Sequence, residues 1–409
     1  MPTPRTRTQS RLWHIREDDF VKKYWSLETT ARFLPFAVFV ATFDRAVIGP
    51  MLITMGDDFN VDLATITVSA SAYLLFYGFA QPVWGLISER LGRIATLQLA
   101  LVSAAVLDIA SVIPMPIEAF IVVRAMAGAT MAGVFPMAVI FLGDTIEKPQ
   151  QRQSAIASLQ TGVAIGLTLG TVLGGVGVVI VGWQAFFVST ALVCFVLAFV
   201  VRKAPNVRPG PNRLPTRVAF AEVARNKWAW FLYLLVFIEA ASLLGGFNLV
   251  PAALEETGRS PAVAGLATGT YGLAVLGTSM VVRRVTNKID PAGFLLIGGI
   301  SAGIGFGMLI AYVSPVTVLI SCALQGVAWV TMHTTLQTWS TTLSNRARAT
   351  AVSFFAGFMF LGNGFGAFVA GYLLDFRGST SMFTVVTTGV IVLTLLAVIG
   401  ARRYQHRLG

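Results

Sequence analysis

Long apolar stretches alternate with short polar segments from about residue 33 to residue 400. Most of these stretches reach the ~20 residues that a helix needs to cross the ~30 Å hydrocarbon core of a bilayer. Within lipid the backbone must satisfy its own hydrogen bonds, so we expect helices. Twelve stretches are found, at residues 33–55, 63–87, 94–113, 116–142, 153–180, 183–201, 228–251, 261–282, 292–313, 315–342, 349–374 and 380–400. The pattern predicts an all-α integral membrane protein with twelve transmembrane helices.

One polar interruption is longer than the others and is rich in proline and arginine. It spans residues 202–227 and divides the stretches into two sets of six. We therefore expect two six-helix bundles joined by a linker. The expected parts are a tail at 1–32, a bundle at 33–201, the linker at 202–227, a bundle at 228–400 and a tail at 401–409.

The composition also indicates lipid as the solvent. Hydrophobic residues make up 55% of the chain and charged residues 12%, and the mean hydropathy is +0.74. A soluble protein carries about 25% charged residues, because its surface must be polar. Cys194 and Cys322 both fall in apolar stretches, so neither a disulfide framework nor a metal site is expected.

The net charge of +11 is explained by where the basic residues lie. Of the 30 Lys and Arg residues, 26 fall in the two tails, the linker and alternate turns. Only Arg259 and Arg377 lie in the opposite turns. Under the positive-inside rule the basic side is cytoplasmic. We thus expect a multi-pass protein of the plasma or inner membrane, with both termini in the cytoplasm. Lipid headgroups, and no nucleic acid, are the expected partners of these charges.

Small residues recur at every fourth position in two corresponding helices, the fifth of each set of six. Such spacing makes a flat stripe on which another helix packs closely. The glycines concerned are Gly166, Gly170, Gly174 and Gly175 in one stretch and Gly362, Gly366 and Gly371 in the other. Repeated halves around a central ligand site are typical of secondary transporters.

Two segments carry charged residues and glycines at a distinctive spacing. The turn after the second stretch has Gly85, Glu89, Arg90, Gly92 and Arg93, and the fourth stretch has Arg124, Gly128, Gly133, Pro136 and Asp144. With these motifs the chain resembles the major facilitator superfamily, and the resemblance extends over nearly the whole chain. It is most similar to the twelve-helix drug:proton antiporter branch. The resemblance implies the major facilitator fold, with two pseudo-symmetric six-helix bundles.

Two positions depart from the family pattern. Glu89 stands where the family usually has Asp, and Thr171 replaces the proline of the antiporter signature in the fifth helix. The second departure weakens the case for antiport, though not for transport.

The first motif makes physical sense as a cytoplasmic latch, which the resemblance also implies. Gly85 and Gly92 permit close backbone approach. Glu89, beside Arg90, is expected near Ser353, where the dipole at the N-terminus of the eleventh helix favours an anion. Arg93 and Asp144 are expected to complete a charge cluster that holds the halves together. The alternative is that these are ordinary topology charges.

Ionisable residues inside the spans are the strongest functional candidates, because each costs ~2.5–3.5 kcal/mol at the centre of a membrane helix. From a rise of ~1.5 Å per residue, Asp44, Arg124 and Glu239 lie at a similar depth near the midplane. The resemblance places the helices of these residues around one central cavity, so we expect Asp44 to pair with Arg124. Arg45, turned about 100° from Asp44, is expected to pair with Asp108. Glu239 has apolar sequence neighbours, so we expect it to carry the coupling proton, with Asp44 as a second candidate. The alternative is a static Asp44–Arg124 bridge and a silent Glu239.

In the family's fold the first, fourth, seventh and tenth helices of the twelve line a central cavity. The resemblance therefore implies substrate contacts for Arg124, Arg45 and further polar or aromatic residues. The additional candidates are Asn248, Gln325, Trp329, Tyr73 and Tyr77. Each has an alternative role in facing another helix. His333 is expected to pack or gate rather than to bind a ligand.

We expect a monomeric, proton-coupled exporter of lipophilic or amphipathic small molecules that works by alternating access and needs no cofactor. One alternative is a proton symporter that imports an organic anion held by Arg45 or Arg124. Another is a sensor with this fold that does not transport. An enzyme is not expected, since no nucleophile–base pair, metal spacing or phosphate loop is found.

Overall fold

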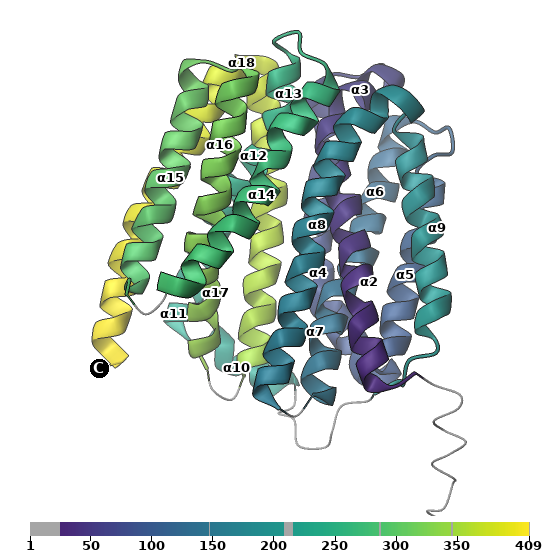
Figure 1. The fold of residues 1–409 in the computed structure, drawn as a ribbon, viewed down its shortest axis with the longest axis vertical. Helices are drawn as coiled ribbons and strands as arrows, with labels where there is room; N and C mark the ends of the chain where they lie inside the picture. Colours follow the sequence, from purple (N-terminus) through teal and green to yellow (C-terminus); the bar gives the residue numbers. More distant parts are fainter. Residues whose placement is uncertain (1–24, 147, 208–215, 286–287, 345–346, 409) are drawn as a thin grey trace, which may run out of the picture.

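The computed structural model describes residues 25–146, 148–207, 216–285, 288–344 and 347–408, and these ranges contain helices and no strand. The helices stand side by side and run roughly parallel to one axis (Figure 1). In the first half they are α2 (Leu27–Val47), η1 (Gly49–Met51), α3 (Leu52–Phe59), α4 (Leu63–Leu91), α5 (Arg93–Ala110), α6 (Ile117–Met131), α7 (Val134–Thr145), α8 (Pro149–Val181) and α9 (Gln184–Val201). The second half has α11 (Lys227–Glu239), η2 (Ala240–Gly245), α12 (Gly246–Asn248), α13 (Val250–Glu255), α14 (Pro261–Val285), α15 (Pro291–Ala311), α16 (Pro315–Ala328), η3 (Trp329–His333), α17 (Thr334–Thr342) and α18 (Arg348–Leu408).

Twelve membrane crossings emerge once the last helix is divided. Eleven continuous helical segments of the described chain are long and apolar enough to cross a bilayer. The last of them, within α18, contains Gly378 with φ of 77° and ψ of 168°, which no helix accommodates. Glycine adopts this conformation without a steric penalty, so a turn forms there. The predicted all-α fold with twelve spans is confirmed.

Two boundaries differ from the sequence-based expectation. The first helix begins at Leu27, inside the stretch expected to be a tail, and Ser26 caps it by accepting a hydrogen bond from the Thr29 amide. The expected linker contains a helix, α10 (Thr216–Ala224). This helix is held against the second half, because Glu222 accepts a hydrogen bond from the Ser344 hydroxyl at 2.5 Å. Residues 1–24 and 208–215 lie outside the described part of the chain.

Short turns join the helices at the end of the bundle opposite the chain termini. Between α3 and α4, Asn60 takes a left-handed conformation with φ of 54°, and the Asp62 carboxylate caps α4. Hydrogen bonds from Thr65 lower the pKa of Asp62 below its usual value. Such capping satisfies amides that the first turn of a helix leaves unpaired.

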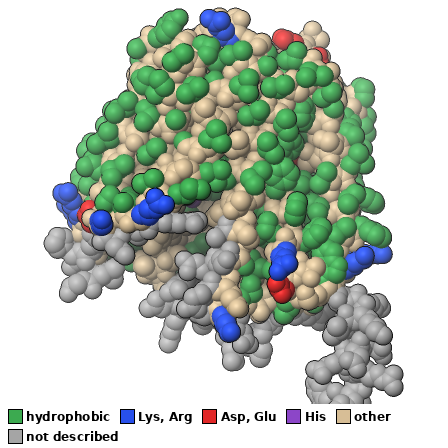
Figure 2. Space-filling model, viewed as in Figure 1, with side chains coloured by type: hydrophobic (Ala, Val, Ile, Leu, Met, Phe, Trp, Pro, Cys, Tyr) green, Lys and Arg blue, Asp and Glu red, His purple; other side chains and the backbone are tan. Residues whose placement is uncertain are grey.

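The outer surface is apolar over most of its height. Figure 2 shows hydrophobic side chains spread over the visible face, with Lys and Arg mainly around its lower rim. Large apolar residues are strongly exposed there and elsewhere, among them Ile180 at 75% and Phe79 at 63%. A soluble monomer rarely exposes apolar patches of this extent, whereas a lipid-facing surface requires them. We call the end where α2 begins and α18 ends the basic end.

The two glycine stripes lie at equivalent helix contacts in the two halves. A Cβ atom on Gly166 would lie 2.7 Å from the Phe39 carbonyl, and one on Gly174 2.7 Å from the Val47 carbonyl, so α8 packs on α2 backbone to backbone. In the other half, Gly362 and Gly366 of α18 meet the backbones of Phe237 in α11 and Ala241 in η2 in the same way. Gly170 likewise meets Phe43 and Ala46. The internal repetition read from the sequence is therefore a repetition of helix packing.

Neighbouring glycines join one half to the other. A Cβ on Gly175 would meet Pro261 and Gly265 of α14, and one on Gly371 would lie 2.6 Å from Thr67 of α4. Figure 1 likewise shows α8 and α14 side by side toward the upper end. The largest contacts across the seam between the halves are those of α8 with α14 and of α4 with α18, and η1 and α3 add smaller contacts with α13 and α14.

The packing predicts a stability difference between two glycine-to-alanine variants. Gly366→Ala places a methyl group where the Ala241 backbone lies, whereas a methyl group on Gly303 of α15 would meet no other described part of the chain within 4 Å. Overpacking a close contact costs ~1–3 kcal/mol. We expect Gly366→Ala to lower the thermal unfolding midpoint in detergent and Gly303→Ala to leave it unchanged or raise it. Equal midpoints for the two variants would contradict this account of the stripe.

Candidate transport site

Three of the helices that carry buried charges are interrupted near those charges. The first span changes from α2 to the short 3-10 helix η1, while η2 and η3 are π-helical. Asp44 and Arg45 lie in the last turn of α2, Glu239 immediately precedes η2, and His333 ends η3. Single π turns inside α-helices often mark functional sites. The interruptions therefore lie beside Asp44, Arg45 and Glu239, which the charge pattern also singles out, and beside His333, which it does not.

The first half contains a buried cluster of two carboxylates around one guanidinium. Arg124 donates to Asp108 at 2.9 Å and to Asp44 at 3.5 Å, and the Tyr73 hydroxyl donates to Asp44 at 2.8 Å. All three charged side chains are at most 1% exposed. The Arg124 guanidinium also lies over the rings of Tyr73 and Phe187, at 4.9 and 4.3 Å. The expected Asp44–Arg124 pair is present.

Asp108 has a different partner from the one expected. The sequence predicted a pair with Arg45, but Asp108 pairs with Arg124. Of the two carboxylates that Arg124 contacts, Asp108 is the closer, at 2.9 Å against 3.5 Å for Asp44. The reason is geometric, because α5 packs on α6, which carries Arg124, while Arg45 points toward the second half. One guanidinium therefore serves two acids. Asp44 Oδ1 and Asp108 Oδ2 have no hydrogen-bond partner among the described residues.

The second half contains a separate buried pair. His333 Nδ1 lies 3.0 Å from Glu239 Oε2, with the Glu239 side chain fully buried and the His333 side chain 9% exposed. The imidazole stacks on Trp329 at 3.8 Å with an interplanar angle of 9°. Sequence reasoning gave Glu239 no partner and gave His333 a packing or gating role. The two residues lie 94 positions apart, so no local pattern links them.

Arg45 lies between the halves. Its guanidinium is 5.0 Å from the ring centre of Phe360 in α18 and 5.9 Å from that of Tyr77 in α4. It also lines a small cavity of about 20 Å³, to which Tyr73 and Asn248 contribute from opposite halves. That volume holds about one water molecule. In this conformation the seam is thus almost closed around Arg45.

The other candidates are divided between the seam and helix packing. Asn248 reaches the cavity and donates to Asn363 at 2.9 Å, and Tyr77 packs against Phe360 with ring centres 4.1 Å apart. Gln325 is buried and donates to Ser321 within its own helix, and Trp329 supports His333. The candidates therefore do not form one shared lining; they surround two charge clusters and a seam.

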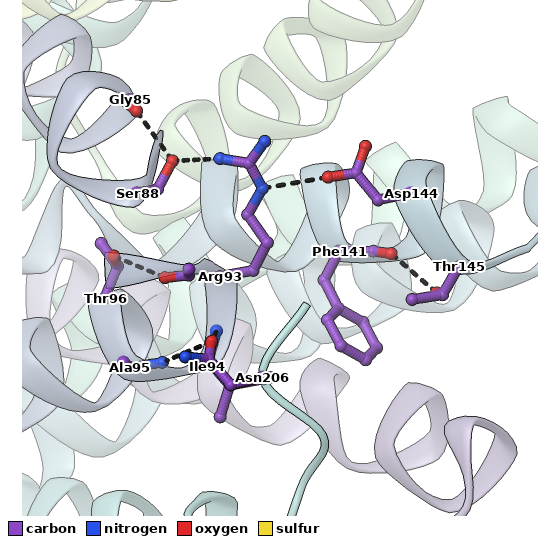
Figure 3. A network of polar contacts seen from close by, with 11 residues as sticks. Gly85, Ser88, Arg93, Ile94, Ala95, Thr96, Phe141, Asp144, Thr145 and Asn206 are labelled. Carbon is purple, nitrogen blue, oxygen red and sulfur yellow. Dashed lines mark hydrogen bonds and ion pairs between the residues drawn. The ribbon is translucent and has the colours of Figure 1, made fainter. Parts of the chain in front are cut away.

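The predicted latch residues lie in a polar network at the basic end (Figure 3). Arg93, 1% exposed, donates to Asp144 at 3.0 Å and also to the Ser88 hydroxyl, which in turn donates to the Gly85 carbonyl. These contacts join α4, α5 and α7. The Arg93–Asp144 pair is thus formed between helices of the first half. That this cluster also holds the two halves together stays a prediction. Contact of Glu89 with Ser353, and the role of Arg90, stay predictions.

Asn206 completes this network and was missed by sequence reasoning. Its side-chain oxygen accepts hydrogen bonds from the amides of Ile94 and Ala95, and its amide group donates to the Leu91 carbonyl. The segment after α9 thereby caps the start of α5 and the end of α4. Gly92, with φ of 89°, lies directly beneath it, so a side chain there would be strained and would also meet Asn206. Asn206 lies more than a hundred residues after the helix ends that it caps, so this contact can be recognised only in the folded structure.

The profile of the major facilitator superfamily matches residues 34–252 and 235–407, two overlapping matches that together cover both halves. The chain belongs to this superfamily. Its two matches follow the repeated packing described above, and the family and fold are those of a membrane transporter.

Similar proteins agree with the fold. The chain is 24% identical over 233 residues to an uncharacterized transporter of the family, YybF from Bacillus subtilis, covering 54% of this chain and 56% of the relative. It is 26% identical over 177 residues to multidrug resistance protein D of Escherichia coli, covering 43% and 45%. The chain thus spans about half the length of each. A bacterial homolog of the human lysosomal transporter Spinster, in an inward-facing, unoccupied conformation, superposes with a TM-score of 0.75 at 16% identity, covering 92% and 97%.

Proposed function

We propose that the protein is a proton-coupled secondary transporter that exports lipophilic or amphipathic small molecules by alternating access. The observation that supports this best is the buried Glu239–His333 pair beside two π-helical turns. Export is supported by similarity to a relative named as an efflux pump, apf11 of Gibberella fujikuroi, which is 28% identical over 237 residues. A shared fold alone does not name a ligand or a direction.

The pair is suited to hold one proton reversibly. With one proton between them, the two groups are neutral as acid and imidazole, or an ion pair as carboxylate and imidazolium. Removal of that proton leaves a carboxylate without a counter-charge, in a side chain that is 0% exposed. Because a buried unpaired charge is costly, release requires a conformation in which water reaches Glu239. This dependence ties the proton to the opening of one side.

The Asp44 cluster supplies a second candidate for proton binding. Two ionised acids around Arg124 leave a net negative charge in a fully buried site. A proton on one of the acids removes that excess. The unpartnered oxygens of Asp44 and Asp108 are where such a proton resides.

The energy available from one proton suffices for uphill export. A charge that crosses 100 mV gains ~2.3 kcal/mol. At ~1.4 kcal/mol per tenfold ratio, this sustains a gradient of roughly forty-fold. One carrier carboxylate per cycle is therefore enough.

A second candidate function is proton symport of an organic anion into the cell. The observation that favours it is the Arg45 guanidinium at the seam, which has no carboxylate partner among the described residues. Thr171 in place of the antiporter proline also favours it.

The direction of proton movement separates the two functions. Purified protein in liposomes with a pH dye in the lumen receives naphthalene-2-sulfonate or ethidium outside, two permanently charged compounds that carry no proton across the lipid themselves. Antiport predicts a lumen that becomes alkaline as the compound enters, and symport one that becomes acidic. Liposomes with the Glu239→Gln variant are the control. No proton movement with any transported compound would contradict both.

The remaining features of the proposal follow from the charges and the helices. We propose that the protein works as a monomer in the plasma or inner membrane, with the basic end and both termini in the cytoplasm. Its partners are the small-molecule substrate and membrane lipids. No cofactor takes part other than the coupling proton.

A further inference from the structure

Arg45 differs from the other arginines that the structure buries in the helical bundle. Arg93 and Arg124 each contact a carboxylate at 3.0 Å or less. Arg45 has no ion pair and no side-chain hydrogen bond within the described ranges, although it lies in the middle of a span and is only partly exposed. An arginine in the middle of a membrane span is costly, so a partner is expected.

The nearest acids are already engaged. Asp44, the adjacent residue, accepts hydrogen bonds from Tyr73 and Arg124, and Glu239 faces His333. Asp108 is held by Arg124 in the same cluster. The part of the chain that the structure describes therefore supplies cation–π contacts to Arg45 but no ion pair.

The aromatic rings beside Arg45 offer attraction to its charge but no hydrogen bond to its N–H groups within the described ranges. Its guanidinium carbon lies over the rings of Phe360 and Tyr77, so both contacts are cation–π contacts. The N–H groups of a guanidinium lie in its plane, and they match the two oxygens of a carboxylate or phosphate. Tyr77 and Phe360 are buried against each other in this conformation, so they offer an apolar surface to a ligand only when the halves separate.

The position of Arg45 makes its exposure depend on the transport cycle. Phe360 belongs to the second half and Tyr77 to the first, and the cavity beside Arg45 is lined from both halves by Thr67, Tyr73 and Asn248. When the halves rock apart, this seam opens and the guanidinium is uncovered. A ligand held there is exposed to one side and then enclosed.

We infer that the transported compounds carry an anionic group, carboxylate or phosphate, which binds Arg45 while their apolar part packs on Phe360 and Tyr77. The inference rests on the proposed transport function and names its substrate class. It holds for export and for import alike, because binding at the seam precedes either direction. A lipid headgroup phosphate has the same chemistry, so the experiment must separate the two sources.

The test is a thermal-shift titration of the purified full-length protein with matched ligands. 1-Naphthoate and 1-naphthyl phosphate carry the anion, whereas methyl 1-naphthoate and 1-naphthylmethylammonium share the ring system without it. A ligand that binds the native state raises the unfolding midpoint. We expect the two anions to stabilise the wild type and the other two compounds to have little effect. Arg45→Gln should weaken anion binding at least tenfold, and Arg45→Lys less.

Matched variants separate the site from general charge effects. Arg377→Gln removes the same charge at an exposed turn and should bind the anions as the wild type does. If Arg45→Gln does not yield folded protein, Arg45→Lys and Phe360→Ala take its place, each with a severalfold loss expected. Equal responses to 1-naphthoate and its methyl ester, unchanged anion affinity in the Arg45 variants, or no shift with either anion would overturn the inference.

The same thermal-shift measurement with lipids identifies the source of the anion. The unfolding midpoint in micelles that contain phosphatidylglycerol is compared with that in micelles of phosphatidylcholine alone. Protection by phosphatidylglycerol that depends on Arg45, without a response to the soluble anions, would assign the site to lipid and overturn the substrate inference. Anion binding without proton movement in liposomes would leave the substrate class standing and remove the coupling proposal.

Discussion

The Glu239→Gln variant should bind and exchange substrate but lose the ability to concentrate it. Glutamine keeps the size and hydrogen-bonding capacity of the side chain beside His333, 3.0 Å away, but cannot release a proton. Under an imposed proton gradient we expect the accumulation ratio to fall from up to roughly forty-fold, the limit for one proton at 100 mV, to about one. Counterflow of labelled against unlabelled compound should persist, because it needs no net proton transfer.

Two controls define this prediction. Glu118→Gln changes an exposed acid in the first turn of α6 and should accumulate substrate normally. His333→Gln removes the partner but not the acid, so partial accumulation with an altered pH profile is expected. A Glu239→Gln variant that still builds a gradient would rule out this pair as the carrier. The Asp44→Asn variant then becomes the critical one.

Removal of Arg124 should destabilise the protein more than removal of either acid that it serves. Arg124→Gln leaves Asp44 and Asp108 buried, at 0% exposure, without their cation. Breaking a buried ion pair from one side costs ~3–5 kcal/mol. The unfolding midpoint in detergent should therefore fall well below that of Asp44→Asn or Asp108→Asn.

A double variant tests whether the loss has this electrostatic cause. Asp108→Asn in the Arg124→Gln background removes one of the stranded charges and should recover part of the stability. The interaction free energy of such a cycle isolates the pair from other effects of each change. Additive losses would show that Arg124 acts through its packing on Tyr73 and Phe187 instead. An unchanged midpoint for Arg124→Gln would contradict both explanations.

The sequence predicts the architecture well because membrane topology depends on properties that are local in the chain. Apolar length sets the spans, and the break between the last two was expected at 374–380, where Gly378 forms the turn. The glycine stripes are periodic within single helices, so their packing role was readable. The Asp44–Arg124 pair followed from the similar depth of the two residues together with the family resemblance, which places their helices around one cavity.

The other contacts of the site depend on the direction in which each side chain points from its helix and on segments that are far apart in the sequence. Depth cannot tell which way a side chain points, so Asp108 was assigned to Arg45 instead of Arg124. Glu239 and His333 meet through a contact between helices 94 residues apart. The π-helical turns that orient both residues have no simple sequence signature. In the sequence Asn206 looks like any polar loop residue, and only the fold shows that it accepts a hydrogen bond from the Ile94 amide.

The arrangement of α8 has a mechanical consequence. Gly174 lies against the Val47 backbone of the first helix, close to Asp44 and Arg45, whereas the next residue, Gly175, lies against Gly265 of the other half. Backbone contacts of this kind contain no flexible side chain that could absorb a displacement. Any sliding of one half along the other at Gly175 is thus passed directly to the helix that carries the charges. Helix α8 thus couples the movement of the two halves to the helix that carries Asp44 and Arg45. A bulky residue at Gly174 or Gly175 should slow the transport cycle as well as lower the stability of the fold.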